Sequence, residues 1–140
     1  MKKFLTAAAV GLAFALPAAV GLACGYCAED KIASVYDHAA VKKALGNGHQ
    51  VAFFHIEGIL VPERAIRRAL LASAESVEGV DRGSVRISLE TASLSLAFDS
   101  RRTSLAAVQT ALDSKLAAKR LSLFYFQGLD RPAELKAAKR

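Results

Sequence analysis

The feature that most constrains the fold is a change of hydrophobic period along residues 51–126. Apolar residues alternate or run together, as is typical of strands, in four segments: 51–56, 85–90, 94–98 and 121–126. Between them, residues 62–77 and 105–116 repeat apolar side chains at helical spacing. The predicted order is therefore β-α-β-β-α-β. Its simplest fold is an α+β, ferredoxin-like sandwich, with two helices on one face of a four-stranded antiparallel sheet.

Length and composition narrow the class of protein further. The 140 residues, 53% of them hydrophobic, suffice for one small domain and are too few for two. The net charge of +6 is a mild surplus, so it is weak evidence for a nucleic-acid partner. The outward positions of the third strand (Ser93, Ser95 and Ala97) lack the aromatic residues that an RNA-recognition module needs. We therefore expect no nucleic-acid partner, and the sequence carries no motif that supports an enzyme.

The first 23 residues read as a bacterial secretory signal. Lys2 and Lys3 precede an almost wholly apolar run from Phe4 to Val20, and small residues stand before Cys24. Cleavage after Ala23 would release a periplasmic or otherwise exported protein that begins at Cys24. A retained membrane anchor and lipidation of Cys24 are alternatives, although a glycine stands where a lipoprotein signal usually has leucine.

Residues 49–128 resemble the heavy-metal-associated domain of copper chaperones and metal-transport ATPases. The resemblance depends on the segments Ile56-Glu57-Gly58-Ile59 and Val77-Glu78-Gly79-Val80, and on the strands at 85–89 and 94–98. It implies the same ferredoxin-like fold. The family binds its metal in a Gly-Met-x-Cys-x-x-Cys loop, but Ile59, Val61 and Arg64 stand here at the Met and the two Cys positions. The usual loop therefore has no metal ligands.

The cysteines lie instead in an N-terminal unit, residues 24–48, that precedes the domain. We predict a helix from Cys24 to Ala44, stopped by Gly46-Asn47-Gly48. By the resemblance, Ala52, Phe54 and Ile56 face the domain's own helices, and Val51, Phe53 and His55 face the other side of the sheet. Because a strand that is apolar on both faces needs cover on both, we expect the additional helix to lie on the open face.

Cys24 and Cys27 are the candidate metal ligands. The start of a helix favours the thiolate form, and two thiolates suffice for near-linear Cu(I), whereas Zn(II) needs two more ligands. The sequence thus indicates an exported soft-metal carrier, and a partner protein or a second copy of the chain could complete the coordination. Two alternatives stay open. The pair could form a structural disulfide in an envelope interaction module, or it could exchange disulfides with other proteins.

The histidines and the basic segments contribute less to this prediction. His38 lies about 16 Å beyond Cys27 along a continuous helix, so it cannot share a metal with the pair. His49 is expected at the far end of the domain, and His55 could face the additional helix. We interpret Arg64, Arg67 and Arg68 as a solvated helix face that could also dock an acidic partner. Residues 129–140 form a basic tail.

Overall fold

The computed structural model describes residues 27–130 of the chain. Its strands are β1 (Gln50–Glu57), β2 (Arg86–Ser88), β3 (Ser93–Phe98) and β4 (Ser122–Leu129). Its helices are α1 (Ala28–Val35), α2 (His38–Gly46), α3 (Arg64–Glu75) and α4 (Leu105–Leu116), followed by a short 3₁₀ turn, η1 (Ala117–Lys119). Within residues 27–130, none of the helices is both long and apolar enough to cross a bilayer.

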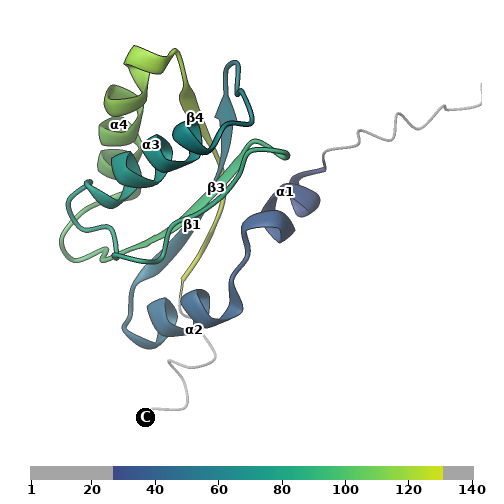
Figure 1. The fold of residues 1–140 in the computed structure, drawn as a ribbon. Coiled ribbons are helices and arrows are strands. Elements are labelled where there is room, and N and C mark those ends of the chain that lie inside the picture. Colours follow the sequence, from purple (N-terminus) through teal and green to yellow (C-terminus); the bar gives the residue numbers. More distant parts are fainter. Residues whose placement is uncertain (1–26, 131–140) are drawn as a thin grey trace, which may run out of the picture.

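The four strands form one antiparallel sheet in the order β2-β3-β1-β4. Helices α3 and α4 lie side by side on one face of this sheet (Figure 1). The order β1-α3-β2-β3-α4-β4, with both crossover helices on the same face, is the ferredoxin-like arrangement. The fold class predicted from the sequence is therefore confirmed.

The inner core fills the space between the sheet and helices α3 and α4. Ala52, Phe54 and Ile56 point into it from β1, as predicted, and each is at most 1% exposed. They meet apolar side chains that recur at helical spacing on the two helices, namely Leu70, Ala74, Val108, Leu112 and Leu116. The alternation of β1 thus places every second residue in this core.

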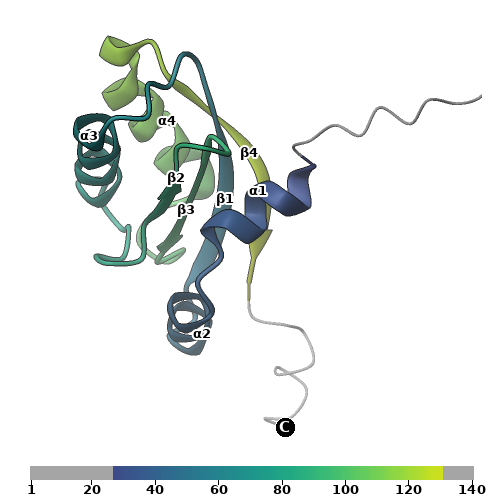
Figure 2. The same ribbon diagram turned by 45° about the vertical axis from the view of Figure 1, so that its right-hand side comes forward.

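The opposite face of the sheet is covered by α1 and α2, which we call the outer layer (Figure 2). Val51 and Phe53 of β1 are buried there against Val35, Val41 and Ala44. Phe53 is only 1% exposed, so the predicted cover over the open face is confirmed. The outward residues Ser93, Ser95 and Ala97 of β3 are small, which lets α1 approach the sheet closely, and all three are buried.

The prediction of one continuous helix over residues 24–44 is wrong within the described part of the chain. Tyr36 and Asp37 are extended and separate α1 from α2. The carboxylate of Asp37 caps α2, because its Oδ1 accepts a hydrogen bond from the Ala40 N–H at 3.0 Å. The break redirects the chain, so that α1 packs chiefly on β3 and β2 while α2 packs on β1 and β3. Figure 1 shows the change of direction between the two helices.

Several boundaries also differ from the sequence prediction. The strand expected over 85–90 has only three residues, because the hairpin turn already begins at Leu89 and Ser93 belongs to β3. The second helix starts at Arg64 and ends at Glu75, inside the expected range of 62–77. Strand β4 continues to Leu129, one residue beyond the predicted end of the domain.

Candidate functional site

Cys27 lies at the start of α1, where it is the N-cap residue and is exposed to solvent. Its backbone is extended and its carbonyl oxygen accepts the N–H of Lys31 at 3.2 Å, but its side chain makes no capping hydrogen bond. The thiol is therefore not used to close the helix end. Cys24, the other predicted ligand, lies outside the described residues.

The position of α1 is fixed by a buried lysine one turn after Cys27. Lys31 is 9% exposed, and its Nζ lies 2.8 Å from His55 Nδ1 and donates to the carbonyl oxygen of Thr91 at 3.0 Å. The same ammonium group is 5.9 Å from the ring centre of Phe126, within cation–π range. Burial lowers the pKa of Lys31 below its ordinary value.

Two further hydrogen bonds hold the rest of α1 on the sheet. Ser95 of β3 donates from its hydroxyl to the carbonyl oxygen of Val35 at 2.7 Å, in the buried layer between helix and sheet. In the same last turn of α1, the hydroxyl of Ser34 lies 2.7 Å from that of Thr91, in the turn between β2 and β3. These bonds, with those of Lys31, fix where α1 begins, so Cys27 is presented from an anchored element.

The loop that carries the metal ligands in heavy-metal-associated domains has no such role here. Ile59 is 91% exposed and Val61 is 46% exposed, and Arg64 is the first residue of α3. None of these three side chains offers a soft donor atom. At these three positions the loop therefore presents two exposed apolar side chains and an arginine.

The three histidines lie apart and have different surroundings. His55 faces the outer layer, as expected, with its Nδ1 2.9 Å from the Ala92 carbonyl oxygen and 2.8 Å from Lys31 Nζ. This nitrogen donates to the carbonyl in one tautomer and accepts from the ammonium group in the other. The ring of His55 stacks on Phe126. His38 is exposed at the start of α2, beyond the break in the helix. Neither histidine joins Cys27 in a ligand set.

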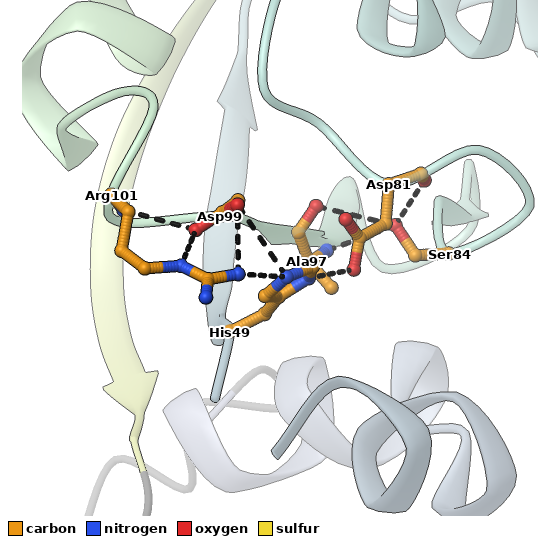
Figure 3. A network of polar contacts seen from close by, with 6 residues as sticks. All are labelled: His49, Asp81, Ser84, Ala97, Asp99 and Arg101. Atoms are coloured by element: carbon orange, nitrogen blue, oxygen red, sulfur yellow. Dashed lines mark hydrogen bonds and ion pairs between the residues drawn. The ribbon is translucent and has the colours of Figure 1, made fainter. Parts of the chain in front are cut away.

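His49 belongs to a polar network that the sequence did not reveal (Figure 3). It precedes β1, with Nδ1 2.8 Å from Asp81 Oδ2 and Nε2 3.7 Å from Asp99 Oδ2. Arg101 holds Asp99 through Nε at 2.8 Å and Nη2 at 3.1 Å. The hydrogen bonds from the Arg101 side chain and backbone lower the pKa of Asp99 to about 2. The network joins the start of β1 to the end of β3 and is expected to be structural.

The described residues contain no second candidate for a metal site. Among residues 27–130, no group of three or more His, Cys, Asp or Glu side chains is placed to hold a metal ion. An open cleft of about 440 Å³ lies beside α2, but its carboxylates are already paired, Asp37 with Arg86 at 2.7 Å and Asp81 with His49. The sequence could have suggested Asp37 as an N-cap, whereas its pairing with Arg86, 49 positions away, depends on the fold.

Fold and site together define the class of this protein. It is a ferredoxin-like α+β domain whose second sheet face is covered by two helices, the first of which starts at an exposed cysteine.

Comparison with known proteins gives structural neighbours only. No protein-family model and no curated protein matches the chain. Among solved structures, it is similar to a copper-binding domain from HMA7, a P-type ATPase, with 11% identity and a TM-score of 0.47 over 56% of this chain and 96% of that one. It is also similar to oxidized MerP from Ralstonia metallidurans CH34, with 22% identity and a TM-score of 0.45 over 56% of this chain and 99% of that one.

A third solved structure is the N-terminal domain of the zinc(II) ATPase ZiaA in its apo form, with 17% identity and a TM-score of 0.41. The match covers 54% of this chain and 63% of that chain, just under two thirds of its length.

Proposed function

We propose that this protein binds a soft metal ion, Cu(I), through Cys24 and Cys27 at the start of α1, and that it carries the ion outside the cytoplasm. The observation behind the proposal is the placement of Cys27, which is exposed at the N-cap of a helix anchored to the sheet. A thiol at the tip of a fixed element can be reached both by the metal and by a partner that receives it.

The chemistry of the available donors supports a monovalent soft ion. Two thiolates satisfy near-linear Cu(I), and the partial positive charge at a helix start stabilises thiolate. Zn(II) would need two further ligands, and residues 27–130 contain no group of three or more His, Cys, Asp or Glu side chains placed to hold a metal ion. Glu29 and Asp30, both exposed in the first turn of α1, add negative charge that attracts a cation. Transfer would then proceed by exchange of thiolate ligands with a partner or a second copy.

A competition titration tests the proposal. The reduced, purified protein is titrated with Cu(I) in the presence of a chelator that competes for the ion, and the metal retained by each chain is measured. We expect one ion per chain, with ultraviolet absorption from copper–thiolate bonds. The double variant Cys24→Ser, Cys27→Ser should lose this uptake, whereas His38→Ala, an exposed position on α2, should keep it. Equal uptake by the double variant would contradict the proposal.

Protein isolated from the envelope without reductant distinguishes the alternatives that the sequence left open. The intact mass of this protein gives the residue at which the mature chain starts and reveals any lipid on Cys24. If the isolated protein contains a Cys24–Cys27 disulfide that only strong reductants open, the pair is structural and the domain is an interaction module. If the disulfide exchanges readily with a dithiol near the potential of thiol oxidoreductases, it serves exchange chemistry.

A further inference from the structure

The end of the domain where β1 leads to α3 combines an apolar tip with an excess of positive charge. We call this surface the basic end and define it as residues 57–68 and 115–121. Two segments form it: the loop after β1 with the start of α3, and the end of α4 with η1. They meet at Gly58, where an added Cβ would lie 2.6 Å from the carbonyl oxygen of Arg120. Both segments lie at the top of Figure 1 and of Figure 2.

The charge of the basic end is strongly one-sided. Its six exposed basic residues are Arg64, Arg67, Arg68, Lys115, Lys119 and Arg120, against two exposed acidic residues, Glu57 and Glu63, so six minus two gives +4. Within residues 27–130, none of the six forms an ion pair. The sequence outside the described residues contains a single acidic residue, Glu134, so the chain's own termini have little charge with which to neutralise this surface.

The apolar tip projects from the same surface. Ile59 is 91% exposed, the highest value among the exposed large hydrophobic residues, and Val61 is 46% exposed, while Leu60 between them packs against the inner core. The packing of Leu60 thus fixes the loop, and Ile59 and Val61 extend into solvent. A projecting apolar side chain needs a matching pocket on a protein partner, but a lipid surface accepts it without one.

We propose that the basic end docks on an anionic membrane surface, with Ile59 and Val61 entering the headgroup boundary and the six basic side chains contacting the lipid phosphates. The free edge of the sheet is a poorer contact surface. On β4, the Leu123 N–H and carbonyl are occupied by Asp113 and Gln109 of α4, and a bulge interrupts the pairing with β1. Docking through the basic end is independent of metal binding, since it uses neither cysteine.

A tryptophan reporter tests the docking, because the chain has no native tryptophan. The variant Ile59→Trp is mixed with vesicles of phosphatidylglycerol and phosphatidylethanolamine, and its indole emission is recorded with and without brominated lipid. We expect a shift to shorter wavelength and quenching by the brominated chains. Both effects should be absent with phosphatidylcholine vesicles, and they should weaken at high salt. A folded Ile59→Trp protein whose emission is unchanged by anionic vesicles would overturn the proposal.

Matched variants separate docking from any attachment through the N-terminal apolar segment, which all of them share. Leu71→Trp, an exposed position farther along α3, should show no quenching. Adding Lys119→Glu and Arg120→Glu to the Ile59→Trp chain should weaken its partitioning more than about tenfold, because two cations that contact lipid phosphates are replaced by anions. Adding Lys42→Glu and Lys43→Glu on α2 instead should leave it unchanged. The proposal would be contradicted if Leu71→Trp were quenched as strongly as Ile59→Trp. It would also be contradicted if the α2 variant lost as much partitioning as the Lys119→Glu, Arg120→Glu variant.

Discussion

The two faces of the sheet are closed in different ways, and two neighbouring residues of β1 show the difference. Phe54 is 0% exposed in the inner core and Phe53 is 1% exposed beneath the outer layer. Within residues 27–130, the inner core contains sixteen buried apolar residues, whereas the outer layer buries six. The outer layer is completed by buried or half-buried polar groups, among them Lys31, Ser95 and Asp37.

Phe54 and Phe53 are thus almost equally buried, but different kinds of interaction hold the helices that cover them. The inner core depends on non-directional apolar packing against two long amphipathic helices. The outer layer has less apolar contact, and its helices of eight and nine residues are too short to be stable alone. A few directional bonds to the sheet therefore decide where α1 and α2 lie, and with them the position of Cys27.

The largest expected effect comes from truncating the two phenylalanines. Phe54→Ala should lower the free energy of unfolding by about 3–5 kcal/mol, because it opens a cavity in the inner core. Phe53→Ala should cost less than this, because the short helices can move to fill part of the space. Urea denaturation measures both. Hydrogen exchange should show that Phe53→Ala exposes amides of residues 28–46 while those of β3 stay protected. Uniform loss of protection in both variants would mean that the two faces form one cooperative unit.

A smaller loss of stability is expected from enlarging Ser95, the residue of β3 that contacts α1. Ser95→Val adds bulk where the helix contacts the sheet and removes the hydrogen bond to the Val35 carbonyl, so it should cost about 1–3 kcal/mol. The control Ser95→Ala removes only the hydrogen bond and should cost about 1 kcal/mol. The two values come from urea midpoints. If Ser95→Val and Ser95→Ala lower the free energy of unfolding equally, close packing of α1 on β3 does not position the helix.

The smallest effects are expected on stability at low pH. Hydrogen bonds from the Ala40 N–H and from Arg86 lower the pKa of Asp37, and Arg101 lowers that of Asp99 to about 2. Because both are depressed below the ordinary value of 3.8, the carboxylates contribute stability above about pH 4 and lose it as the pH falls. For Asp99 the loss extends down to about pH 2. Asp37 caps α2 and pairs with Arg86, so we expect the outer layer to loosen as this carboxylate becomes protonated.

Variants with an uncharged amide in place of the carboxylate measure how much Asp99 and Asp37 contribute to stability. Asp99→Asn should have a lower urea midpoint than the native chain at pH 7, and the difference should shrink as the pH approaches 2. Asp37→Asn keeps an oxygen that can cap α2 but loses the charge that faces Arg86, so its effect should be smaller. A difference between native and Asp99→Asn proteins that is unchanged from about pH 7 to about pH 2 would show that the Asp99 carboxylate does not stabilise the fold.

The sequence predicted most of the fold because its signals are local. Alternation in β1 divided its residues between two faces, and the resemblance implied which set faces the domain's own helices. The apolar residues of the other set implied a cover on the open face. It did not predict the break at Tyr36, where the capping bond of Asp37 competed successfully with helix continuation. The network around His49 was also missed, because Asp81, Asp99 and Arg101 are brought to it only by the pairing of strands.

For the candidate site, the sequence determined the residue chemistry: a Cys-x-x-Cys before a helix, and residues without soft donor atoms in the loop that carries the ligands in heavy-metal-associated domains. Local composition suffices for this, because donor atoms and helix starts are encoded within a few neighbouring residues. Only the tertiary structure decided that the helix is short, that Lys31 and Ser95 anchor it, and that Ile59 projects from a basic end. The anchoring bonds join segments that lie 24 and 60 residues apart, a separation that no local pattern specifies.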